Sequence, residues 1–213
     1  MGSDFVWRME DVLDLYAQPY DAKHPQVCFD ERPVQLLGET YAPLPMSKGK
    51  PRRQDCNYER EGTANLFMMV QPLMGWRMVK ATPHRTKLDF AHCMKDLVDL
   101  YFPEAEAIRV VLDNLNTHTF AALYEAFEPE EARRIARKLE FHSTPKHGSW
   151  LNMAEIEISV LSRQWLQQRL PSLMALSENV TAWTKRRNAQ VVQIKWCFNL
   201  DNARSKLVRL YPH

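Results

Sequence analysis

Residues 145–166 have the sequence PKHGSWLNMAEIEISVLSRQWL, in which a loop is followed by a helical pattern. The loop contains proline, glycine and serine and ends at Asn152, a residue type that favours the N-cap position of helices. Beyond it, apolar residues recur at the i, i+3 and i+4 spacing of a helix; they are Met153, Ala154, Ile156, Ile158, Val160, Leu161 and Trp165. The stretch therefore predicts a helix that begins just after Asn152 and carries Glu155 in its first turn. Acidic residues are common there because the helix N-terminus stabilises negative charge, so Glu155 alone has an ordinary structural explanation.

The composition is that of a globular protein. Of the 213 residues, 45% are hydrophobic and 25% are charged, which suits one domain with a sizeable core. No stretch reaches the ~18 apolar residues that a membrane helix requires, and the N-terminus lacks the basic and apolar segments of a signal peptide. The four cysteines, Cys28, Cys56, Cys93 and Cys197, are far apart, which predicts free thiols in a cytoplasmic protein.

Basic residues are clustered although the formal net charge is only +2. Runs of charge usually form solvent-exposed faces, and this is the first explanation for each cluster. Together the clusters are also compatible with a surface that binds phosphate groups. They consist of Lys48, Lys50, Arg52 and Arg53; of Arg133, Arg134, Arg137 and Lys138; and of Lys185, Arg186 and Arg187.

The hydrophobic patterns along the chain predict strands interspersed with helices. Apolar runs at residues 26–31, 64–70 and 76–81 predict three strands, the last two joined as a hairpin, whereas residues 38–62 lack periodicity and are expected to be irregular. Residues 191–198 fit either a strand or an extended arm. Further strands are predicted at 107–112 and 139–142, and helices at 5–17, 86–101, 119–127, 129–137, 172–187 and 201–209. This order predicts an α/β fold with a mixed central sheet of about five strands, the first three antiparallel, and helices on both faces.

Two of the predicted strands end on an aspartate, Asp30 and Asp113. In a sheet of this order the first strand is central and the strand after the first long helix lies beside it. Asp30 and Asp113 are therefore expected side by side, and the helix that begins after Asn152 would bring Glu155 to them. Successive side chains of a strand point to opposite faces, so Asp30 and Glu31 cannot both serve one site.

Three carboxylates in one cleft repel one another, and such a cluster is stable chiefly when divalent cations neutralise it. Oxygen ligands of this kind suit Mg²⁺ or Mn²⁺. Two such ions support an in-line displacement at a phosphodiester. The acids therefore predict nucleic-acid strand cleavage or transfer.

Three runs of sequence resemble a known family. They are VCFDE at residues 27–31, VVLDNLNTH at 110–118 and TPKHGSWLNMAE at 144–155. These runs are similar to the catalytic blocks of bacterial insertion-sequence transposases of the 630 type, which belong to the mariner-like superfamily with a DDE endonuclease domain. The last two blocks are long and specific, and the resemblance extends over nearly the whole chain.

The resemblance implies the ribonuclease-H-like catalytic domain of a DNA transposase, spanning residues 23–213 after a leading helix and linker at residues 1–22. Asp30, Asp113 and Glu155 would be its catalytic residues and the ligands of two Mg²⁺ or Mn²⁺ ions. The enzyme would hydrolyse DNA at transposon ends and transfer the 3′-hydroxyls into target DNA, as a homodimer in a synaptic complex at the bacterial nucleoid. The family's upstream helix-turn-helix DNA-binding region is expected to be absent, because no sequence before the leading helix could supply it.

The sequence departs from the superfamily pattern at two places. Met153-Ala154 replaces the Pro-Ile of the motif Leu-Asn-Pro-Ile-Glu, which removes a proline that favours the first helical turn. The step from Asp113 to Glu155 is also longer than usual, and residues 128–137 are the expected insertion. Neither departure removes a carboxylate.

Several neighbouring residues are candidates for supporting roles. Glu157 is the rival of Glu155, but two helical positions differ by about 200° in direction, so only one can face the cleft, and motif position favours Glu155. Trp150 is either a core residue or a surface for stacking an unpaired base, and the core is favoured. The residues expected around the metal ligands are Glu31, Asn114 and His118, and those expected to contact DNA are Arg52, Arg53, Lys146, His147 and Ser149.

Two other functions remain open on the sequence. One is a ribonuclease-H-like nuclease that cleaves another substrate without strand transfer. The other is an inactive or domesticated remnant that binds DNA or a partner, although the presence of all three acids argues against decay of the active site.

Overall fold

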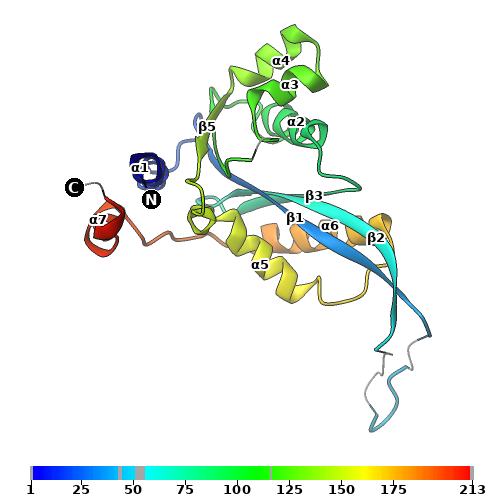
Figure 1. The fold of residues 1–213 in the computed structure, drawn as a ribbon. Coiled ribbons are helices and arrows are strands. Elements are labelled where there is room, and N and C mark those ends of the chain that lie inside the picture. Colours follow the sequence, from blue (N-terminus) through cyan, green and yellow to red (C-terminus); the bar gives the residue numbers. More distant parts are fainter. Residues whose placement is uncertain (1, 43–44, 51–55, 116, 212–213) are drawn as a thin grey trace.

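The computed structural model describes residues 2–42, 45–50, 56–115 and 117–211. Its centre is one five-stranded sheet in the order β3-β2-β1-β4-β5, with helices on both faces (Figure 1). Strand β2 pairs antiparallel with both β1 and β3, whereas β4 pairs parallel with both β1 and β5. The predicted mixed α/β architecture is confirmed. The strands are β1 Gln26–Glu39, β2 Tyr58–Gln71, β3 Trp76–Thr82, β4 Ile108–Leu112 and β5 Leu139–Ser143.

Strands β1 and β2 form a long arm that the sequence did not predict. Residues 38–62 were expected to be irregular, but β1 continues to Glu39 and pairs there with Tyr58 at the start of β2. The first six residues of β2 are exposed. Solvated strand residues need no alternation of apolar and polar side chains, so no periodic signal marks the start of β2, although Leu36 of β1 is buried in the core.

Seven α-helices surround the sheet in the described part of the chain. Helices α2, α3 and α4 cover one face, and α5 and α6 cover the other (Figure 1). Helix α2 continues into a π-helical turn at Leu97–Tyr101. The bounds are α1 Ser3–Tyr16, α2 Lys87–Asp96, α3 Phe120–Ala126, α4 Pro129–Ala136, α5 Ala154–Gln164, α6 Leu173–Ala189 and α7 Leu200–Lys206. None of the described helices is both long and apolar enough to span a bilayer.

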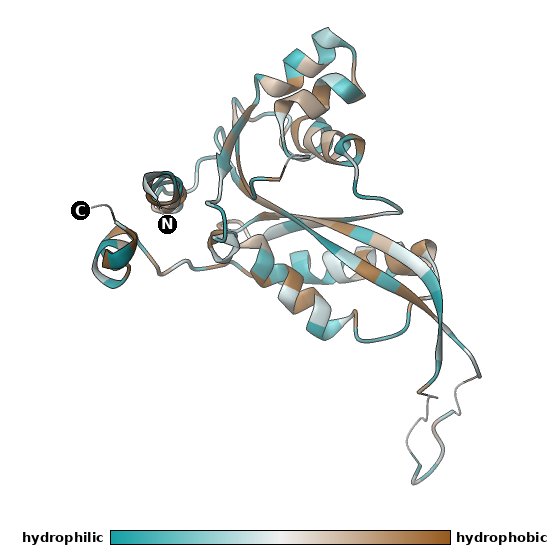
Figure 2. Cartoon of the chain, viewed as in Figure 1, coloured by the Kyte–Doolittle hydropathy of each residue, from teal (hydrophilic) through white to brown (hydrophobic). Residues whose placement is uncertain are grey.

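The sheet separates two hydrophobic cores. Successive residues of β1 alternate between them, so that Cys28 packs with α5 and α6 while Phe29 packs with α2. Each core holds one buried cysteine, Cys28 in the first and Cys93 in the second. Figure 2 shows the hydrophobic residues concentrated along the central part of the sheet. Period-two alternation of this kind positions each acid of β1 on a defined face.

Residues 191–198 form an extended arm and not a strand. Their burial alternates: Val192, Ile194, Trp196 and Phe198 are half-buried, and the residues on either side of each are exposed. The Ile194 N–H donates to the Pro72 carbonyl at 3.1 Å. The arm leads to α7, which lies beside α1 (Figure 1).

Candidate active site

Asp30 lies inside a strand and not at its end, which corrects the expectation from the sequence. Strand β1 runs on to Glu39, but its pairing with β4 ends at Cys28 opposite Val111. Asp30 therefore lies just past the point where the two parallel strands stop pairing, which leaves one side of its position open. Asp113 follows directly after the last residue of β4, as predicted.

Asn152 fixes the start of α5 against β1. Its amide nitrogen donates to the Phe29 carbonyl at 2.8 Å, and its side-chain oxygen accepts from the Ala154 N–H at 3.1 Å. The helix begins one residue later than predicted, so Met153 occupies the N-cap and Asn152 precedes it. A buried amide that bonds to both elements places the first turn of α5, with Glu155, next to the part of β1 that carries Asp30.

The carboxylates act on one another through burial and charge. Burial and, to a smaller extent, the charges of Glu155, Asp113 and Glu31 raise the pKa of Asp30 to about 7, against the hydrogen bond from the Glu31 N–H. Neither Asp30 nor Glu155 forms an ion pair with any described residue. Uncompensated oxygen donors of this kind fit a hard divalent cation. Among the described residues, however, no three Asp, Glu, His or Cys side chains already converge closely enough to enclose an ion.

His118 connects Asp113 with Glu31 on the α2 side of the sheet. Its Nδ1 lies 2.5 Å from Asp113 Oδ1, and its Nε2 lies 2.7 Å from Glu31 Oε2. The imidazole packs against the rings of Phe29 and Phe90, with centroids 5.3 and 4.8 Å away. Burial disfavours the charged ring, but the two carboxylates outweigh it and raise the pKa of His118 to about 9. His118, itself bonded to Glu31, is thus placed to orient the Asp113 carboxylate.

The loop before α5 forms one wall of a pocket of about 330 Å³. His147 has a left-handed backbone (φ 65°), and the Gly148 N–H donates to the Pro145 carbonyl at 2.8 Å. A Cβ at Gly148 would lie 2.9 Å from that carbonyl oxygen, so the turn requires glycine. The pocket is lined by Asp113, Asn114, Leu115, Thr144, Pro145, Lys146, His147 and Ser149. The loop therefore brings a cation, an imidazole and a hydroxyl beside Asp113.

Glu157 points away from the candidate site. It is fully buried, and its carboxylate accepts hydrogen bonds from Arg77 Nη2 at 3.1 Å and from Arg187 Nε and Nη2 at 3.1 and 2.9 Å. Arg77 also donates to the Val192 carbonyl at 2.7 Å. The sequence analysis did not identify this triad. The sequence did contain a signal for it, since Glu157 is an acid among the apolar residues of a helix. A buried carboxylate requires a cationic partner, so an arginine or lysine was to be expected beside it.

One other expectation from the sequence turned out differently, and one is untested. Trp150 is not a core residue: it is 44% exposed and touches the Phe198 ring edge-on at 5.4 Å. It belongs to a 3₁₀ turn at Ser149–Leu151, in which Leu151 alone is buried. The predicted DNA contacts Arg52 and Arg53 lie outside the described residues.

The chain matches a protein family described as DDE superfamily endonuclease over residues 25–177. No curated protein sequence matches it.

Solved structures with a similar fold include three Mos1 assemblies. The Mos1 transposase paired-end complex with left transposon end has a TM-score of 0.57 and 13% identity, covering 87% of this chain and 58% of that one. The Mos1 mariner paired end complex with Mn gives 0.57 and 14%, with 88% and 59% covered. The Mos1 strand transfer complex gives 0.57 and 11%, with 88% and 58% covered. The likeness establishes the ribonuclease-H-like fold, and the chain spans less than two thirds of each of these Mos1 chains.

Proposed function

This chain belongs to the DDE superfamily of endonucleases, and we propose that it cleaves DNA at transposon ends and joins the released 3′-hydroxyls to target DNA. Asp30, Asp113 and Glu155 are the proposed catalytic residues and the ligands of two Mg²⁺ or Mn²⁺ ions. What supports the proposal is that the charges of Glu155 and Asp113 act on Asp30, that β1 and β4 stop pairing just before Asp30, and that Asn152 fixes the start of α5 to Phe29.

The residues have distinct proposed roles. When bound, divalent ions activate the attacking water or hydroxyl and stabilise the leaving oxygen. Asp30 and Asp113 provide the ligands on the sheet. Glu155 is exposed and forms no ion pair with a described residue, so its side chain can turn toward them. His118 and Glu31 fix the orientation of the Asp113 carboxylate.

Lys146, His147 and Ser149 are proposed to bind DNA phosphates next to the metal site, and Asn114 to support the metal ligands. All four are exposed and line the pocket beside Asp113. Cations, hydroxyls and amides are the groups that position a DNA backbone without reading its sequence. Arg52 and Arg53 are also proposed to bind DNA phosphates, on the basis of their positive charge alone.

The finer assignment rests on the three motif runs. They favour the 630-type insertion-sequence transposases, acting as homodimers that pair two element ends at the bacterial nucleoid. The catalytic domain would span residues 23–213. Helix α1 contributes Met9, Val12 and Leu13 to the core on the α5 side, so the leading segment is expected to fold with this domain.

Strand joining on defined DNA tests the function. The purified chain is incubated with duplexes that carry the terminal repeats flanking its gene, either intact or pre-cut to expose a 3′-hydroxyl, and with a supercoiled plasmid as target. Products of cleavage and joining are expected with Mg²⁺ or Mn²⁺ and none with EDTA. Cleavage without joining would indicate a nuclease with another substrate, and binding without either reaction would indicate a non-catalytic remnant.

The substitution His118→Ala is expected to weaken binding of Mn²⁺ by about 10- to 100-fold, the usual cost of losing a partner of a metal ligand. The physical reason is that Asp113 loses the contact that orients its carboxylate, while Glu31 keeps only its ion pair with Arg85. Calorimetric titration of the DNA-free protein measures the affinity. The matched control is His84→Ala, which removes an exposed imidazole. Equal affinities for the two variants would show that His118 has no part in holding the ligand.

A further inference from the structure

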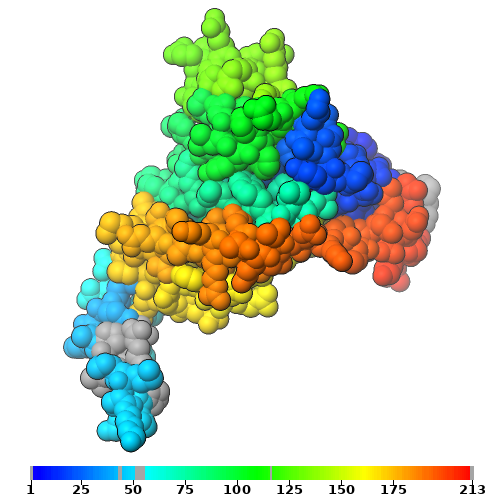
Figure 3. Space-filling model, turned by 180° about the vertical axis from the view of Figure 1, so that it is seen from behind, coloured from blue at the N-terminus to red at the C-terminus, as the bar shows by residue number. Residues whose placement is uncertain are grey.

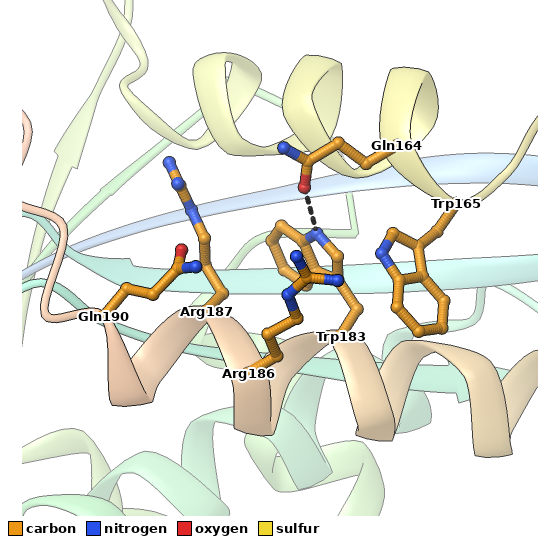
Figure 4. A pocket seen from close by; sticks show the side chains of 6 residues that line it. All are labelled: Gln164, Trp165, Trp183, Arg186, Arg187 and Gln190. Carbon is orange, nitrogen blue, oxygen red and sulfur yellow. Dashed lines mark hydrogen bonds between the residues drawn. The ribbon is translucent and has the colours of Figure 1, made fainter.

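A polar groove lies between the C-terminal half of α5 and helix α6. Helix α6 runs across the face shown in Figure 3, where it is orange. The groove consists of two adjoining pockets of about 260 and 630 Å³ that share Gln164, Trp165 and Arg186. The inner pocket is closed by Trp183, Arg187 and Gln190 (Figure 4). Further glutamine and asparagine side chains line the outer one. We call this feature the α5–α6 groove.

The charge in the α5–α6 groove is positive and uncompensated. Arg187 is neutralised by Glu157, but Arg186 is exposed and has no hydrogen bond or ion pair with any residue that the structure describes. No acidic side chain is among the described residues that line either pocket. The comparable hollow on α4 differs, because Glu130 lies among its arginines. The α5–α6 groove is therefore suited to an anion.

The walls of the groove are held in place before any ligand binds. Trp183 is 1% exposed, and its indole N–H donates to the Gln164 side-chain oxygen at 3.0 Å. This bond fixes the Gln164 amide with its nitrogen directed away from Trp183 (Figure 4). Trp165 is half-buried, and its side chain lines both pockets. Pre-organised groups lose little entropy on binding.

This combination of groups points to one class of ligand. A guanidinium binds a phosphate, an indole stacks on a base, and such stacking is largely independent of sequence. Amides both donate and accept hydrogen bonds, as base edges do, whereas an acidic peptide offers carboxylates that only accept. We propose that the α5–α6 groove binds a single strand of nucleic acid, with Arg186 on a phosphate and Trp165 against a base.

The α5–α6 groove is separate from the candidate active site. Gln164 follows Glu155 by nine residues, which is about 14 Å along the helix and close to two and a half turns, so the two side chains lie on opposite faces of α5. The groove would therefore hold a second segment of strand, away from the phosphodiester that is cut. The proposal rests on the proposed function only in taking DNA as the substrate.

Fluorescence anisotropy tests this proposal with the full chain, a labelled dT12 oligonucleotide and EDTA, so that metal-dependent binding does not contribute. Arg186→Gln is expected to weaken binding by about tenfold and to lower the salt slope by about 0.7, the value for one phosphate contact on a single strand. Trp165→Leu is expected to weaken binding at least about fivefold, and this loss should vanish with an abasic oligonucleotide. The matched control Lys185→Gln removes an exposed charge one residue away, outside the lining of the groove, and should change binding less than twofold.

Several outcomes would overturn the groove as a nucleic-acid site. They are equal losses for Arg186→Gln and Lys185→Gln, absence of binding by the wild type, or equally tight binding of a polyglutamate peptide. Arg186→Gln is a surface change, so the test stands even if Trp165→Leu fails to fold. Failure of the proposed function is distinguishable: a wild type that binds dT12 through Arg186 but never cleaves DNA retains the groove and loses the catalytic assignment. Conversely, if the wild type cleaves DNA and the Arg186→Gln variant binds dT12 normally, the catalytic assignment is retained and the groove is lost as a nucleic-acid site.

Discussion

Replacing Asp30 by asparagine is expected to reduce DNA cleavage by about a thousandfold or more, because a metal ligand supplies several kcal/mol of transition-state stabilisation. The same substitution should leave the metal-free protein at least as stable as the wild type. Burial and the charges of Glu155, Asp113 and Glu31 raise the pKa of Asp30 to about 7, so its negative charge is unfavourable in the folded state. Asparagine has the same shape without that charge. Activity and stability are therefore expected to change in opposite directions.

Two measurements check this result. Gel-based cleavage rates with Mg²⁺ give the activity, and urea unfolding at pH 8 with and without Mn²⁺ gives the free energy of unfolding. The ion should stabilise the wild type and leave Asp30→Asn unaffected. Asp14→Asn, which removes an exposed carboxylate of α1, is the matched control and should behave as the wild type in both assays. Normal cleavage by Asp30→Asn would remove this residue from the metal site.

Replacing Glu157 by alanine is expected to lower the free energy of unfolding by about 3–5 kcal/mol, the usual cost of removing one partner from a buried ion pair. In a domain of this size the loss corresponds to a fall in Tm of roughly 10 °C. The cause is Arg77, whose side chain is fully buried and would lose its carboxylate. Arg187 would lose both of its bonds to the same group. Because this triad joins α5, α6 and β3, its loss is expected to weaken the packing of both helices on the sheet.

The control for this prediction lies two residues earlier on the same helix. Glu155→Ala removes an exposed carboxylate, so its effect on stability should stay within about 0.5 kcal/mol, while its cleavage activity should be lost. Urea unfolding and cleavage assays on both variants separate the two roles. A Glu157→Ala protein as stable as the wild type would mean that the buried arginines find other partners. A fully active Glu155→Ala protein would transfer the catalytic role elsewhere.

The order of elements was predictable because each buried strand has a strong local signal. The strand predicted at residues 107–112 is rich in β-branched side chains, and Ile108–Leu112 form β4. The start of β2 was missed because its first six residues are exposed and carry no alternation of apolar and polar side chains. Trp150 was misplaced for a related reason: an aromatic residue in a short turn carries no periodicity that shows which way it faces.

The position of Asp113 was predictable from the sequence, whereas the surroundings of Asp30 were not. The sequence indicated an aspartate at the end of a strand, and for Asp113 this is what the structure has. For Asp30 the position is open because β4 stops pairing before it, although β1 itself continues. Where a neighbouring strand ends is a tertiary property and leaves no mark on residues 26–31. The contact between Asn152 and Phe29 is likewise long-range, so a cap was the only role that local sequence could suggest.

Each of the two cores contains one buried cysteine, whose reactivity reports local opening of that side of the sheet. Burial raises the pKa of Cys28 to about 11 and that of Cys93 to about 12, so neither thiol reacts readily from the folded state. Cys56 and Cys197 are exposed and can be blocked first. The alkylation rate of each remaining thiol then measures how often its side of the sheet opens, so the α5 side and the α2 side can be followed separately in one sample without any substitution.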